Sequence, residues 1–88
     1  MQIKYTSLSV NMNYGEHERN RIKRRNEVCA RLEKAGIKYT TENGYGGYNV
    51  NALCAAKEIP ANALRLSRVI YQHNEDGAPC DNEGKPLF

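Results

Sequence analysis

Residues 37–51, IKYTTENGYGGYNVN, carry the pattern that decides the fold class of this chain. Each half places apolar, aromatic or β-branched residues at alternate positions, as strands with one buried face do: Ile37, Tyr39, Thr41, Tyr48, Val50 and Ala52. Asn43-Gly44 is the strongest short turn signal between the halves, and Gly46-Gly47 loosens the start of the second strand. The segment is therefore predicted to form a β-hairpin.

Upstream of the hairpin, residues 16–35 are predicted to form a helix. The sequence Ala35-Gly36-Ile37 is typical of a helix that stops at a glycine and is followed by an apolar residue. In the second half of the helix, apolar residues share one face: Val28, Cys29, Leu32 and Ala35. The first half has no such stripe, because Arg21 and Arg25 project toward the apolar side, so we expect it to extend past the core.

The two ends of the chain supply the remaining elements. Residues 2–12 alternate as a strand does, with a break in parity near Thr6 and Ser7 that a β-bulge would explain. Residues 51–73 are predicted to form two helical pieces split by Pro60, because proline suits the first turn of a helix and cannot continue one. One face of the second piece collects Ala63, Leu66, Val69, Ile70 and His73.

These elements predict a small α+β domain over residues 1–73, in the order strand, helix, hairpin and one or two helices. Residues 74–88 are polar and rich in turn residues, and we expect an irregular C-terminal tail there. With a closing edge strand at 85–88, the order would be the ferredoxin-like βαββαβ pattern. Without that strand, the domain is a three-stranded α+β unit.

Composition narrows the classes of function. The 88 residues include 13 Lys and Arg against 10 Asp and Glu, for a net charge of +3, with the basic excess between residues 19 and 34. No apolar run approaches the ~20 residues that a membrane-spanning helix needs, and no signal-peptide pattern occurs. We therefore expect a cytoplasmic protein with no membrane partner.

No catalytic or metal-binding pattern stands out. Cys29, Cys54 and Cys80 are odd in number and widely spaced, and the two histidines are too few for a convincing zinc site. No nucleophile–base grouping and no phosphate-binding loop is present. The prediction is that the chain is not an enzyme and holds no metal or cofactor; its oligomeric state is left open.

The main functional signal is a cluster of basic residues in the first half of the predicted helix: Arg19, Arg21, Lys23, Arg24 and Arg25. Several cations on one element can neutralise phosphates without reading sequence. The alternative is a charged face that only keeps the chain soluble, which an i,i+4 pair of Glu27 with Arg31 would support. Cations near a helix start oppose the helix dipole. The cluster therefore favours an anionic partner: nucleic acid, DNA rather than RNA, or an acidic protein surface.

Residues 55–70, AAKEIPANALRLSRVI, resemble the helix–turn–helix of repressor-type DNA-binding proteins, with small and apolar matches and Ser67-Arg68 where that family often carries Ser-Arg. The family's turn glycine corresponds to Pro60, whose ring forbids the positive φ that the turn needs. Two short packed helices are the alternative. The resemblance implies that Arg65 and Arg68 contact phosphates or bases.

Residues 43–50, NGYGGYNV, partly resemble the aromatic signature on the third strand of RNA-recognition domains. That likeness implies that Tyr45 and Tyr48 stack on bases. The alternatives are that these tyrosines cover the core, or that they contact a protein, since tyrosine is enriched at interface hot spots.

The segments NGYGGYN, IPANALRLSRVIYQHNEDGAP and GKPL resemble small uncharacterised early proteins of podophages. The resemblance implies a role in host takeover, in the cytoplasm of a bacterium. Two functions follow as expectations. The first is a nucleic-acid-binding protein that uses the basic helix for phosphate contacts. The second is a phage-encoded inhibitor or adaptor that binds a host protein through the basic helix and the tyrosine hairpin.

Overall fold

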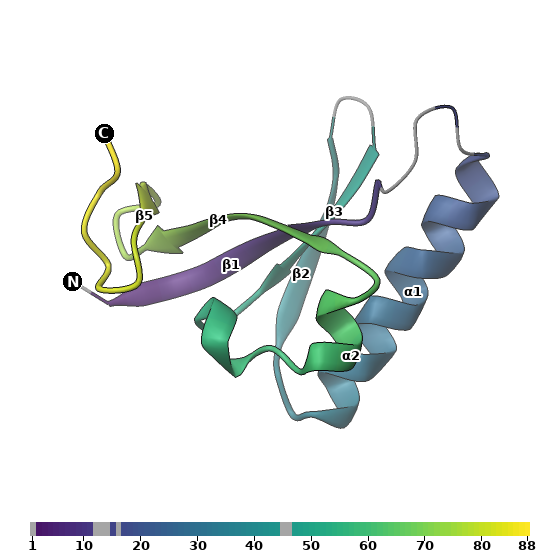
Figure 1. Cartoon of the computed structure of the whole chain (residues 1–88), viewed down its shortest axis with the longest axis horizontal. Helices are drawn as coiled ribbons and strands as arrows, with labels where there is room; N and C mark the ends of the chain where they lie inside the picture. Colours follow the sequence, from purple (N-terminus) through teal and green to yellow (C-terminus); the bar gives the residue numbers. More distant parts are fainter. Residues whose placement is uncertain (1, 12–14, 16, 45–46) are drawn as a thin grey trace.

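The computed structural model describes residues 2–11, 15, 17–44 and 47–88, and it contains a five-stranded antiparallel sheet. Its elements follow one another along the chain as β1 (Ile3–Ser9), α1 (Glu18–Lys34), β2 (Tyr39–Gly44), β3 (Gly47–Ala52), a 3-10 turn η1 (Ala56–Glu58), α2 (Ala61–Leu64), β4 (Arg68–Asn74) and β5 (Pro79–Cys80). The strands lie side by side in the order β2-β3-β1-β4-β5, so β1 is central (Figure 1). The predicted α+β class is confirmed.

The end of α1 follows directly from its sequence. Gly36 has a φ of 76°, a left-handed conformation that costs glycine little. Its N–H donates to the carbonyl of Glu33 at 3.0 Å, and the N–H of Ile37 donates to that of Leu32 at 2.9 Å. This pair of bonds is the Schellman motif, which satisfies carbonyls at the helix end. The predicted glycine stop is confirmed, and it turns the chain into β2.

The core lies on one face of the sheet, under the second half of α1. Leu8 of β1 is opposite Val50 of β3, and both are fully buried. Val28 and Leu32 are the buried residues of α1. Around them the core cluster is completed by Val10, Ala52, Ile59 and Ala63. The helices α1 and α2 touch each other over this face (Figure 1).

The hairpin forms where the alternation predicted it, but its turn is placed differently. Asn43 pairs with Tyr48 and Gly44 pairs with Gly47, so Asn43-Gly44 ends β2 and is not the turn itself. Residues 45–46, which connect the strands, lie outside the described residues. This register places Tyr39 and Thr41 opposite Ala52 and Val50, both of which are fully buried.

Two helical pieces split by Pro60 are present, as η1 and α2, but the predicted length of the second piece is wrong. Helix α2 ends at Leu64, and β4 begins at Arg68 and pairs with β1. The run Val69-Ile70-Tyr71 has strand propensity, and pairing with a distant strand is invisible to local periodicity. The second helix required by the helix–turn–helix resemblance is therefore absent from residues 65–73.

Residues 74–88 are polar and turn-rich as expected, but they fold back onto the sheet. Asn74 is fully buried; its side chain accepts bonds from the N–H groups of Asp76 and Ala78 and donates to the carbonyl of Gly84 at 3.1 Å. Strand β5 pairs with β4, while residues 85–88 form a bridge from Pro86 to Cys80 and a bond from the N–H of Leu87 to the carbonyl of Pro79 at 3.0 Å. The strand that follows the helical segments is therefore β4, and β5 pairs with it at the edge of the sheet. The second helix is reduced to η1 and α2, so the ferredoxin-like prediction is not confirmed beyond its class.

Candidate nucleic-acid interface

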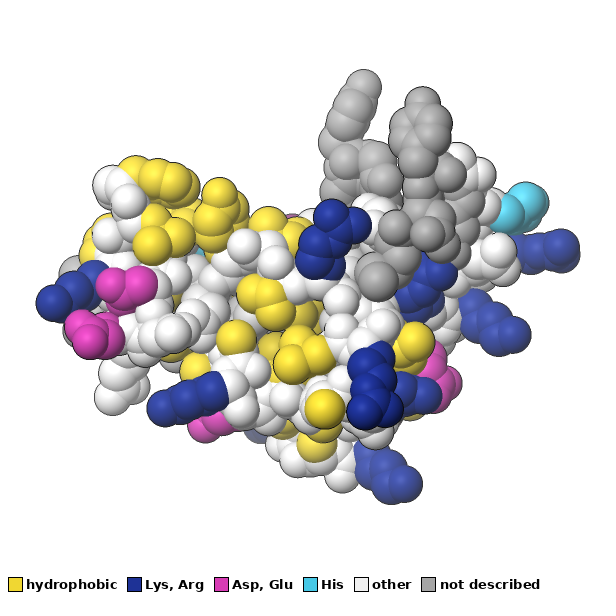
Figure 2. All heavy atoms as spheres, in the orientation of Figure 1, with side chains coloured by type: hydrophobic (Ala, Val, Ile, Leu, Met, Phe, Trp, Pro, Cys, Tyr) yellow, Lys and Arg dark blue, Asp and Glu magenta, His cyan; other side chains and the backbone are white. Residues whose placement is uncertain are grey.

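Charge is separated along the long axis of the molecule, which spans 38 Å. Figure 2 shows most of the dark-blue basic side chains on the right, along α1, whereas the left end carries magenta acidic side chains together with a few basic ones. We call the α1 side the cationic end; its basic residues are Arg19, Arg21, Lys23, Arg24, Arg25, Arg65 and Arg68. At the acidic end, the chain after β4 carries Glu75, Asp76, Asp81 and Glu83 together with one cation, Lys85, which lies 3.5 Å from Glu83. The net charge of +3 is therefore the sum of a mainly basic end and a mainly acidic end.

Arg19 and Lys23 are the most accessible members of the basic cluster. Both are exposed, and their i,i+4 spacing places them on one face of α1. Neither forms an ion pair with a carboxylate in the described ranges. The helix begins here at its N-cap residue His17, whose Nδ1 accepts a hydrogen bond from the N–H of Arg19 at 3.2 Å. These two cations can reach an external anion without breaking an internal contact.

Arg24 of α1 and Arg68 of β4 both donate hydrogen bonds to backbone carbonyls just after the end of β1. Arg24 Nη1 donates to the carbonyl of Val10 at 2.5 Å, and Arg68 Nη2 donates to the carbonyl of Asn11 at 3.1 Å. Arg68 is exposed, and its other N–H groups make no hydrogen bond with the described residues. Since a guanidinium carries five donors, Arg68 can hold this carbonyl and an anion together.

Tyr48 has a structural role in this arrangement. Its hydroxyl donates to Glu18 Oε1 at 2.6 Å, which raises the pKa of Tyr48, and Arg25 lies 5.2 Å above its ring. Arg21 is half-buried beside them, with its Nε enclosed and making no hydrogen bond to a described residue. The first half of α1 is thus fastened to the hairpin by polar and cation–π contacts. The predicted absence of a buried apolar stripe from this half is confirmed, since the buried residues of α1 are Val28 and Leu32.

The other predicted site residues fall into two groups. Arg65 caps the end of α2, is exposed and has no ion pair within the described part of the chain. Tyr45 lies outside the described residues. The predicted Glu27–Arg31 pair is confirmed at 3.0 Å, and Arg31 also donates to the carbonyl of Asn62 at 2.5 Å. Arg31 lies outside the cluster of basic residues between 19 and 25.

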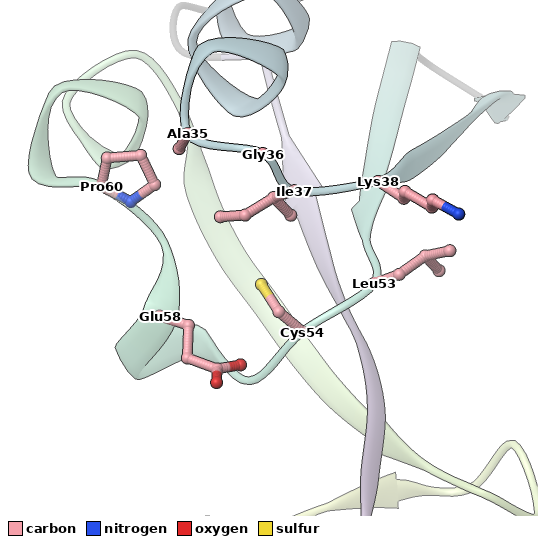
Figure 3. Close-up of a pocket in the computed structure, with 8 residues that line it drawn as sticks. All are labelled: Ala35, Gly36, Ile37, Lys38, Leu53, Cys54, Glu58 and Pro60. Atoms are coloured by element: carbon pink, nitrogen blue, oxygen red, sulfur yellow. The ribbon is translucent and has the colours of Figure 1, made fainter.

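A surface pocket lies at the opposite end of α1, between the α1–β2 loop and the segment after β3 (Figure 3). The side chain of Lys38 points away from Cys54 and Glu58 (Figure 3). Glu58 accepts the N–H of Ala55 at 3.0 Å, and burial raises the pKa of the Cys54 thiol. A thiol held in its protonated form is a poor nucleophile. The pocket brings no acid–base pair together among the residues described.

Metal ligands do not converge in the described ranges, where no three or more His, Cys, Asp or Glu side chains lie together in a way that could hold an ion. Burial also raises the pKa of Cys29 and Cys80. Among the helices described, none is long and apolar enough to span a membrane.

Sequence reasoning missed a second set of candidate residues, on the sheet face opposite the helices. These are the aromatic side chains Tyr5, Tyr71, His73 and Phe88, which contact one another. Periodicity assigned Tyr71 and His73 to a helix and Phe88 to a tail. The run of β-branched and aromatic residues from 69 to 71 is the signal that could have revealed the strand.

Comparisons with protein-family models, with curated proteins and with solved structures find no match to this chain. Its function therefore has to be inferred from the charges, contacts and exposed surfaces of the chain itself.

Proposed function

We propose that this chain is a small nucleic-acid-binding protein that holds phosphates at its cationic end. The observation that carries the proposal is the set of exposed cations without an ion-pair partner among the described residues: Arg19, Lys23, Arg65 and Arg68. A surface of this kind attracts a polyanion because each contact releases a condensed counterion. The site would act in the cytoplasm, where nucleic acid is within reach.

The arrangement of the cations favours a polyanion over a single small anion. Arg19 and Lys23 project from α1, Arg65 ends α2, and Arg68 begins β4, so the charges come from three elements spread over one end of the molecule. The acidic end repels the same ligand and orients it. Electrostatic orientation of this kind raises association rates and falls with ionic strength.

The test is the salt dependence of binding. Anisotropy of a labelled oligonucleotide, measured over a series of salt concentrations, gives the slope of log K against log salt. We expect Arg19→Ala with Lys23→Ala to flatten this slope by about one unit for each phosphate that the variant no longer neutralises. The matched control is Lys4→Ala with Lys85→Ala, which removes two exposed cations away from the cationic end and leaves the slope unchanged. Equal slopes in both variants would refute the proposal.

A second candidate function is docking on a protein with an acidic surface, as an inhibitor or adaptor. It is favoured by Val69 and Ile70, which are 40% and 43% exposed on β4. Only Gln72 and His73 of β4 pair with β5, so the outer edge of residues 68–71 has no strand partner in the described chain. An exposed apolar strand edge can accept a strand from another protein. A complex recovered from bacterial lysate after nuclease treatment would support this candidate.

A further inference from the structure

The sheet has a second face that no described element covers. Thr6 and Leu8 of β1 are fully buried beneath the helices. Because side chains alternate along a strand, Tyr5, Ser7 and Ser9 point to the opposite face. We call this opposite side the open face.

Register extends the open face across the sheet. Residues directly opposite one another on neighbouring strands share a face. Ser7 lies opposite Asn51 of β3 and Tyr71 of β4. Ser9 lies opposite Asn49 and Arg68, and Tyr5 lies opposite His73. The pairing of β1 with β4 shifts register between Ser7 and Leu8, and this shift puts Arg68 on the same face as Tyr71. The open face therefore combines aromatic, amide and guanidinium groups on three neighbouring strands.

The aromatic groups form a continuous row. Tyr5 and His73 are stacked, with ring centroids 4.4 Å apart and planes 10° from parallel. Tyr71 meets His73 edge to face at 6.5 Å and Phe88 edge to face at 6.2 Å. Tyr71 is 40% exposed and Phe88 is 89% exposed. The row is held in place by its own ring contacts and still offers π surface to solvent.

The amide groups beside this row are oriented in advance. Ser7 Oγ donates to Asn51 Oδ1 at 2.8 Å, and Asn51 Nδ2 donates to Glu42 Oε1 at 3.1 Å. These bonds fix which way the carboxamide of Asn51 points. The side chain of Asn49 makes no hydrogen bond with a described residue, so a donor and an acceptor stay available there.

The two ends of β4 carry opposite charges beside the open face. Arg68, at the start of β4, shares this face with the aromatic row and belongs to the cationic end. At the other end of β4, the turn that follows carries Glu75 and Asp76. The open face also carries the carboxylate of Glu42, which lies opposite Asn49 and accepts the bond from Asn51. A polyanion on this face is therefore drawn toward Arg68 and away from both Glu42 and the turn, which leaves uncharged bases as the groups suited to the aromatic row.

We propose that the open face binds single-stranded nucleic acid, with bases stacked on Tyr71 and Phe88 and a phosphate held by Arg68. This inference rests on the proposed function and deepens it by naming the strand state of the ligand. Bases stack on exposed aromatic rings in many single-strand-binding proteins, because every base has a π face. In a duplex the bases are already paired and stacked, so a duplex can use the cationic end and not the aromatic row.

The experiment compares three polyanions: a single-stranded oligonucleotide, a duplex of the same sequence, and inorganic polyphosphate, which carries charge without bases. We expect Tyr71→Ala to weaken single-strand binding by about 5- to 150-fold, the equivalent of one stacked base. Binding of duplex and of polyphosphate stays unchanged. Tyr71→Phe keeps the ring and is the matched control, with an affinity within about twofold of wild type.

A second variant separates stacking from apolar contact. Tyr71→Leu keeps a large apolar side chain on β4 and removes the π surface, so it is expected to weaken single-strand binding as Tyr71→Ala does. Circular dichroism of each variant confirms that the sheet is retained. Tight single-strand binding by both Tyr71→Ala and Tyr71→Leu would overturn the inference.

Failure of the inference and failure of the proposed function give different results. Salt-dependent binding of all three polyanions that ignores Tyr71 overturns the inference and leaves the proposed function in place. Single-strand binding that depends on Tyr71 and not on Arg19 or Lys23 keeps the inference and overturns the placement of phosphate contacts on α1. A protein that binds none of the three polyanions, and that forms a dimer dissociated by Tyr71→Ala, overturns both and assigns the open face to a second copy of the chain.

Discussion

The two halves of α1 belong to one unbroken helix and are held by different physical chemistry. The second half buries Val28 and Leu32 in the core and ends in the Schellman motif at Gly36. The first half has no buried apolar residue; it is held by the ring of Tyr48 and by the bond from Arg24 to the end of β1. The second half therefore contributes mainly to stability. The first half keeps charged side chains at the surface and contributes little apolar packing.

The contrast between the halves predicts how strongly each one affects stability. Leu32→Ala has the largest expected effect, a loss of about 2–5 kcal/mol in the free energy of unfolding, because it leaves a cavity in a fully buried site. Denaturant unfolding measures it. The matched control is Leu53→Ala at a site 45% exposed. If Leu32→Ala does not fold, Leu32→Met keeps the volume and is expected to cost less than about 1.5 kcal/mol. Equal losses at positions 32 and 53 would contradict the assignment of Leu32 to the buried core.

Within the first half of α1, Arg24→Ala is expected to lower the free energy of unfolding the most. It removes the charged donor from the carbonyl of Val10, a loss of about 1–3 kcal/mol by denaturant unfolding. Arg19→Ala, earlier in the helix and exposed, is the control and should leave stability nearly unchanged. A neutral Arg24→Ala would mean that the end of β1 does not depend on this contact.

Tyr48→Phe should have a smaller effect, with a defined pH dependence. The bond from Tyr48 to Glu18 raises the pKa of the phenol in the folded state. A raised folded pKa means that the bond stabilises fully below the unfolded value of about 10 and that this stabilisation is lost as pH rises through the folded value. The difference in unfolding free energy between wild type and Tyr48→Phe should therefore vanish in strong alkali.

The tyrosine titration supplies an independent check. Tyr39 donates to Glu33 and its pKa is likewise raised. Ultraviolet absorbance should show Tyr39 and Tyr48 ionising late in the titration, and Tyr39→Phe or Tyr48→Phe should each remove part of the late phase. A late phase that survives both substitutions would show that these hydroxyls are not held by the helix.

Arg19→Ala with Lys23→Ala has the smallest expected effect on stability, within about 0.5 kcal/mol, because both side chains are exposed and unpaired among the described residues. The same pair should alter the salt slope of nucleic-acid binding. Thermal unfolding and anisotropy on one preparation measure both quantities. A large loss of stability would show that these cations belong to the fold and not to a binding surface.

The candidate site was only partly predictable. The cluster between residues 19 and 25 is visible as a run of letters, and Arg21 and Arg25 do turn toward the sheet, as helical spacing predicted. That Arg24 and Arg68 would meet at the end of β1 was not predictable, because the two residues are brought together by strand pairing. The open face was missed for the same reason.

The end of α1 and the two strands of the hairpin could be read from the local sequence, because a glycine stop and an alternating pattern act over a few residues. Residues 68–74 took their conformation from tertiary pairing instead. Their apolar spacing fits a helix, but β1 offers backbone hydrogen bonds along the whole segment, and Val69, Ile70 and Tyr71 accept strand geometry readily. Pairing between strands at opposite ends of the chain leaves no local trace in the sequence.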